Sequence, residues 1–150
     1  MTTEEKMNPN KTARIAGVLY LILAITGGFA FFFLSSLIVP GDAAATADNI
    51  LASETLFRIG LVSDLIGQTV FVLLVLALYK LLKPVNKNQA VLMVIFALVG
   101  VPIAMLNVLN QLAALILLSG SDYLTVFTAD QLQAQAMFFL NLNEQGYFIS

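Results

Sequence analysis

The sequence predicts an all-α fold: a helical transmembrane bundle with three spanning helices and two amphipathic helices at the outer face. Hydrophobic residues make up 59% of the 150-residue chain and charged residues only 11%, whereas soluble globular domains have about 45–50% and about 25%. Three runs with little or no charge also reach the about 20 apolar residues that a spanning helix needs. We expect a single membrane domain over residues 15–150, after a cytoplasmic tail over residues 1–14.

The three spans are separated by clear stop signals. We expect them over about residues 15–39, 57–82 and 90–118. Pro40 and Gly41 close the first span, and Pro84 ends the second because proline disfavours a helical residue before it. Pro102 lies inside the third span, where we expect a kink because apolar residues resume at once and membrane helices tolerate proline. The first span exceeds the about 7–15 apolar residues of a signal peptide, so we expect it to be retained.

Two shorter segments predict amphipathic helices on the outer side. Residues 42–56 are rich in alanine, with Asp42 placed as an N-cap. Residues 129–145 follow a capping box and carry apolar residues at helical spacing. Such helices are typical of a membrane interface. Glu54 precedes Arg58 by four residues, the favourable order for an ion pair, so we expect an interfacial ion pair there.

Basic residues lie on one side of the predicted bundle. Six of them flank the first span and the turn between the second and third: Lys6, Lys11, Arg14, Lys80, Lys83 and Lys87. Cytoplasmic loops concentrate Lys and Arg, and the segments on the other side are mostly acidic. We therefore expect a multi-pass protein with its amino terminus in the cytoplasm.

The residue types also exclude several kinds of chemistry. The chain has no Cys and no His, so it offers no thiol nucleophile and no imidazole base, nor the usual ligands of zinc or haem. A net charge of −2 leaves no basic field for nucleic acid. We expect no catalytic residue, no metal site, no cofactor and no enzymatic activity. The expected partner is the lipid bilayer, with self-association into a homo-oligomer left open and the ligand unknown.

Polar residues inside the spans define the candidate site. An ionisable residue in a span costs about 2.5–3.5 kcal/mol on insertion scales and usually faces the bundle or a cavity. Asp64 is such a residue, and Gln68 follows one turn later on the same face. Asn107, Asn110 and Gln111 share one face of the third span at a matching depth. If the two helices pack together, these side chains form a polar pocket in the outer half of the bilayer.

Two functions fit this pocket. The first is a small transporter or sensor that handles a proton or a polar solute there. The second is a structural or protein-interaction role, in which the amides only bond helices together at about 0.6 kcal/mol each. The residue types alone favour the second, because no other deeply placed charge and no clearly broken helix accompanies Asp64.

Four stretches of the chain carry a more specific pattern. They are residues 11–20, 56–67, 77–87 and 106–112. They resemble the domain-of-unknown-function 4386 family of bacterial integral membrane proteins, especially at Arg58, Asp64 and the paired asparagines with glutamine. The resemblance implies a protein of the bacterial cytoplasmic membrane. It also implies about six spans in the full-length members, and so a chain that is truncated at its carboxy terminus. Because the family pattern includes the polar positions, the resemblance favours a functional pocket more than the residue types alone do.

Overall fold

The computed structural model of the chain describes residues 9–147. Its helices are, in chain order, α1 (Pro9–Leu37), α2 (Ala43–Ala52), α3 (Glu54–Leu82), α4 (Lys87–Leu118), the short 3-10 helix η1 (Asp122–Leu124) and α5 (Ala129–Gly146). No strand occurs between residues 9 and 147, so the predicted all-α class is confirmed. The helices α1, α3 and α4 are long and apolar enough to cross a membrane, as the sequence predicts.

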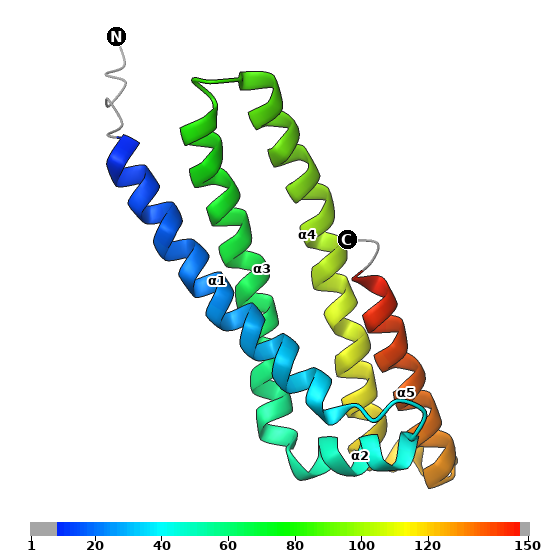
Figure 1. The fold of residues 1–150 in the computed structure, drawn as a ribbon. Helices are drawn as coiled ribbons and strands as arrows, with labels where there is room; N and C mark the ends of the chain where they lie inside the picture. The colour runs from blue at the N-terminus through cyan, green and yellow to red at the C-terminus, as the bar shows by residue number, and fades with distance from the viewer. Residues whose placement is uncertain (1–8, 148–150) are drawn as a thin grey trace.

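The three long helices run up and down beside one another, and α3 packs against both α1 and α4 (Figure 1). α2 lies across one end of this bundle. We call this end, which also carries η1, the α2 end; the opposite end, with the start of α1 and the connection between α3 and α4, is the turn end. This arrangement agrees with the predicted order of span, interfacial helix, span and span.

The helix boundaries differ most from the predicted ones at two places, the start of α1 and the end of α2; in addition α1 ends at Leu37, and α3 and α4 each begin three residues earlier than predicted. α1 begins at Pro9 among the described residues, so part of the predicted tail is helical; Lys6 and the other residues before Pro9 lie outside the described range, as do residues 148–150. The predicted outer helix over residues 42–56 is shorter than expected. Ser53 leaves the helical conformation, with φ −122° and ψ 29°, so α2 ends at Ala52 and α3 starts at once.

Local capping explains where the connections lie. The Asp42 carboxylate accepts a hydrogen bond from the Ala45 amide at 2.9 Å and starts α2, as its placement in the sequence predicts. The Thr128 hydroxyl and the Gln131 side chain form the predicted capping box of α5. Gly120, with φ +69°, turns the chain after α4 through a conformation that glycine adopts without steric cost. α4 runs through Pro102 as one helix, and the predicted kink stays a prediction.

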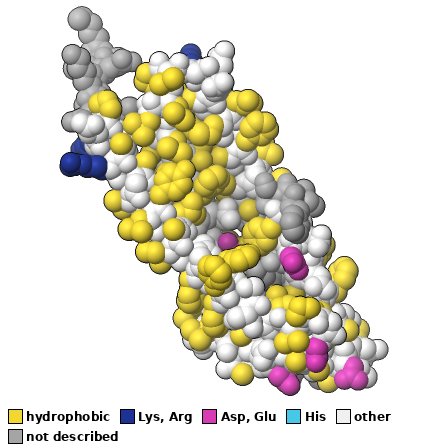
Figure 2. Space-filling model, in the orientation of Figure 1, with side chains coloured by type: hydrophobic (Ala, Val, Ile, Leu, Met, Phe, Trp, Pro, Cys, Tyr) yellow, Lys and Arg dark blue, Asp and Glu magenta, His cyan; other side chains and the backbone are white. Residues whose placement is uncertain are grey.

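Many apolar side chains are exposed on the outer surface of the bundle, as a lipid-facing surface requires, and Figure 2 shows them over one face. Phe31, Phe32 and Phe96 are 70%, 74% and 68% exposed, and many aliphatic side chains of the three long helices are exposed as well. A soluble monomer rarely exposes so continuous an apolar surface. Figure 2 also shows Lys and Arg towards the turn end and Asp and Glu gathered towards the α2 end.

The main core lies towards the α2 end, where all five α-helices contribute side chains. Ile50, Phe57 and Leu115 are at most 1% exposed there. In the same region α1 and α3 approach closely, because a Cβ at Gly60 would lie only 2.9 Å from Leu34 Cδ2. The α2 end therefore contains the most closely packed side chains of the bundle, and the polar residues described below lie beside this core.

α5 takes a course that the sequence does not specify. Its predicted helix is present, but instead of lying flat across the bundle it turns back along α4 towards the middle of the bundle (Figure 1). The reason is the face formed by Ala136, Leu140 and Asn143, which is buried in the contact with the neighbouring helices. Asn107, its contact on α4, lies eleven residues before the end of that helix at Leu118, which is about 16 Å along the helix axis.

Candidate functional site

Four amide side chains lie together at the contact between α4 and α5, and we call them the amide cluster: Asn107, Asn110, Gln111 and Asn143. Asn107 Nδ2 donates to the Asn143 backbone carbonyl at 2.7 Å, and Asn143 Nδ2 donates to the Asn107 backbone carbonyl at 2.9 Å. Gln111 Nε2 donates to Asn143 Oδ1 at 2.8 Å, and Asn110 Nδ2 donates to Asn107 Oδ1 at 2.9 Å. The cluster therefore bridges the two helices in both directions.

The amide cluster is buried and has a defined orientation. Asn107, Gln111 and Asn143 are only 6–7% exposed. Because each of the four amide nitrogens donates to a carbonyl, no side chain of the cluster can be flipped without placing two donors or two acceptors together. Gln111 Oε1 is the one buried side-chain atom without a hydrogen-bond partner in the part of the chain that the structure describes.

Gly146 allows the end of α5 to approach α4 beside this cluster. A Cβ on this residue would overlap the Asn107 carboxamide, because the backbone of α5 lies directly against that side chain. A glycine is required here for close approach and not for an unusual backbone conformation, since its φ is not positive.

The Asp64 carboxyl bonds to a residue at the end of α5 and not to the amide cluster. The Tyr147 hydroxyl, at the end of α5, donates a hydrogen bond to Asp64 Oδ2 on α3. Asp64 is 9% exposed, and Tyr147 is 42% exposed. Partial burial and the neighbouring Asp64 carboxyl both raise the pKa of the Tyr147 hydroxyl above its ordinary value, so the phenol keeps its proton and remains a donor.

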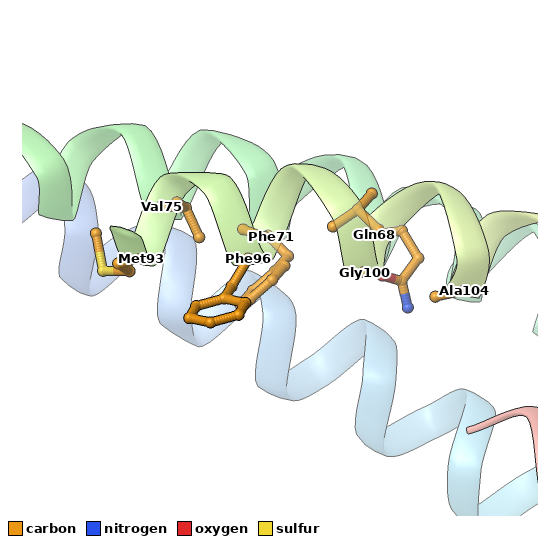
Figure 3. A pocket seen from close by; sticks show the side chains of 9 residues that line it. Gln68, Phe71, Val75, Met93, Phe96, Gly100 and Ala104 are labelled. Carbon is orange, nitrogen blue, oxygen red and sulfur yellow. The ribbon is translucent and has the colours of Figure 1, made fainter. Parts of the chain in front are cut away.

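Gln68 lies in a different place, in the groove between α3 and α4 (Figure 3). The groove has a volume of about 470 Å³ and is lined mainly by apolar side chains. The five side chains expected to meet therefore divide into three parts of one region. Asn107 and Gln111 bind α5, with Asn110 bonded to Asn107 on α4 itself. Asp64 binds Tyr147, and Gln68 borders the groove.

The pair Glu54 and Arg58 has the geometry of an ion pair. Arg58 Nη2 lies 2.8 Å from Glu54 Oε1, and Arg58 Nε donates to the same oxygen at 2.9 Å. Both side chains are about half exposed, so the pair contributes little to stability, about 0–1 kcal/mol.

Three residues of the site could not be assigned from the sequence: Asn143, Gly146 and Tyr147. They come from α5 and from Tyr147, the residue that follows it, and the course of α5 along α4 was not predicted. The available signal was Asn143, a polar residue at helical spacing from Ala136 and Leu140 on an otherwise apolar face. Within residues 9–147, no group of three or more potential metal-ligating side chains occurs.

Three apolar helices of membrane-spanning length, an apolar outer surface and a buried polar region define a multi-pass helical membrane protein. The sequence matches the DUF4386 family, which is described as a domain of unknown function, over residues 15–150. Because this match covers most of the chain, the protein belongs to the DUF4386 family, as its sequence motifs indicate. No curated protein and no solved structure matches the sequence.

Proposed function

We propose that this membrane protein is a small transporter or sensor in which Asp64 is the group that responds to protons. The observation that carries the proposal is the hydrogen bond between Asp64, buried in a span, and Tyr147, at the end of a helix that extends only part of the way along α4. Ionisable residues within spans commonly mark ion and proton pathways.

Protonation of Asp64 has a direct structural consequence in this arrangement. A hydrogen bond to a carboxylate is roughly twice as strong as one between neutral groups. Protonation of Asp64 therefore weakens its hydrogen bond to Tyr147, and this hydrogen bond is what connects α3 to the end of α5. A ligand or proton that binds two conformations unequally shifts their populations, and the position of the α5 end is the element that would shift.

The hydrogen bonds within the amide cluster favour a structural role for its residues. Asn107 and Asn143 bond each other's backbone in both directions, which needs no ligand. We assign these amides to holding α5 on α4 and reserve the responsive role for Asp64. A purely structural protein remains the second candidate, and the experiment below separates the two.

The proposal includes a location and an orientation. Lys11, Arg14, Lys83 and Lys87 lie at the turn end, which by the positive-inside rule faces the cytoplasm. The α2 end then faces outward, and Asp64 lies in the outer half of a bacterial cytoplasmic membrane. The partner is the lipid bilayer, with further copies of the chain as an open alternative, and we propose no enzymatic activity.

The test is a conformational response of α5 to pH. The chain has no native Cys, so the variant Leu142→Cys, at an exposed position of α5, carries a single environment-sensitive fluorophore in lipid nanodiscs. We expect its emission to change on acidification and this change to be lost in Asp64→Asn. The matched control is Asp48→Asn on the exposed face of α2, which should respond as the parent does.

Two results would contradict the proposal: no change of emission with pH in the parent, or a change that persists in Asp64→Asn. Size-exclusion chromatography and helical circular dichroism check that Asp64→Asn is folded. If the response is present, proton flux into liposomes that contain a pH-sensitive dye separates a transporter from a sensor.

A further inference from the structure

We propose that the groove between α3 and α4 binds a lipophilic organic cation, with Asp64 as its counter-charge. This inference rests on the proposed function, because it names the class of ligand for the same acid. The groove is bordered by Phe71, Val75, Met93 and Phe96 towards the turn end and by Gln68 and Ala104 towards the amide cluster (Figure 3).

The groove suits the body of an apolar molecule. It lies between two long apolar helices, and among the described residues that line it Gln68 is the one strongly polar side chain. Figure 3 shows Met93 at one end of the groove and Ala104 at the other, with the side chains of Phe71 and Phe96 between them. A volume of about 470 Å³ is within the usual size range of small-molecule sites, and an apolar ligand can enter from the lipid.

The polar end of the groove lies next to Asp64. Gln68 is four residues after Asp64 on α3, so the two side chains project from the same face one turn apart. On α4, Ala104 precedes Asn107 by one turn. Asp64 itself does not line the groove. A ligand that extends one turn past Gln68 would reach the Asp64 carboxyl, of which Tyr147 occupies one oxygen.

The charges around this end favour a cation. Arg58, the basic residue of α3 towards the α2 end, is already paired with Glu54. Lys80 is twelve residues from Gln68, about 18 Å along α3. Asp64 is thus the nearest charge on α3, and the faces of Phe71 and Phe96 add the attraction of aromatic rings for cations. A neutral acyl chain would not use Asp64, and an anion would be repelled by it.

The experiment compares two ions of similar shape and opposite charge, tetraphenylphosphonium and tetraphenylborate. Their binding to the purified chain in nanodiscs is measured by equilibrium dialysis, with empty nanodiscs as the blank for partition into lipid. We expect saturable binding of the cation only. Asp64→Asn should weaken binding about tenfold or more through loss of the charge contact.

Two further variants sharpen the result. Phe96→Ala removes a largely exposed ring from the groove wall and should weaken cation binding about two- to fivefold without affecting folding. Asp48→Asn, outside the groove, should bind as the parent does. Saturable binding of both ions, no binding above the blank, or binding that is unchanged in Asp64→Asn would each overturn the inference.

Failure of this inference can be told apart from failure of the proposed function. If no cation binds but the fluorescence of labelled α5 still depends on pH through Asp64, the ligand class is wrong and the responsive role stands. If the cation binds through Asp64 but α5 does not respond to pH, the groove is a binding site and the responsive role is wrong.

Discussion

Replacing Asn143 by Ala should lower the free energy of unfolding by roughly 2–4 kcal/mol. The change removes two side-chain hydrogen bonds, each worth about 0.6 kcal/mol on average between membrane helices. It also leaves the Gln111 amide buried without a bonded partner among the described residues, which costs about 1–3 kcal/mol more. The loss is large because one side chain serves both as donor to Asn107 and as acceptor from Gln111.

The free energy is measured by denaturant titration in mixed micelles, followed by circular dichroism. The matched control is Asn141→Ala on the same helix, where the side chain is exposed and the loss should stay within about 0.5 kcal/mol. Equal stability of the two variants would contradict the role of Asn143 in holding α5 to α4.

Gly146→Ala should lower stability by about 1–3 kcal/mol, although alanine is the better helix former. The added Cβ overlaps the Asn107 carboxamide. That side chain cannot move freely, because it accepts a hydrogen bond from Asn110 and donates one to the backbone carbonyl of Asn143. The end of α5 must therefore separate from α4. Separation also removes Tyr147 from Asp64, so the variant should lose the pH response of labelled α5.

Gly28→Ala is the control for this change. Nothing lies within 4 Å of a Cβ at Gly28 on α1, so this variant should be as stable as the parent or more stable by up to about 1 kcal/mol. Both variants are compared by the same titration. If Gly146→Ala is as stable as Gly28→Ala, α5 does not lie against Asn107 as described.

The spans and α2 could be predicted because their signals are local. A long apolar run sets the length of a spanning helix, and side chains such as Asp42 cap the helix they precede. The course of α5 could not be predicted in the same way. Its apolar stripe specifies which face is covered, but a membrane interface and the side of α4 are both apolar enough to cover it.

The candidate site was predictable to the same extent. The depth and shared face of Asn107, Asn110 and Gln111 follow from helical geometry, and so does the shared face of Asp64 and Gln68. Their partners do not, because Asn143 and Tyr147 come from a helix whose position depends on tertiary packing. The three amides of α4 consequently bond to one another and to α5, and Asp64 bonds to a phenol rather than to an amide.

The measurement that tests the central claim most directly is infrared difference spectroscopy of the chain in nanodiscs across an acid titration. The chain has nine Asp and Glu residues, so the diagnostic signal is the component of the protonated-carboxyl band that disappears in Asp64→Asn. The account predicts that this component is shifted in Tyr147→Phe, because the phenol bonds to that carboxyl, and that it keeps its parent position in Asp48→Asn. A band that loses no component in Asp64→Asn, or an Asp64 component that is identical with and without the Tyr147 hydroxyl, would contradict the account.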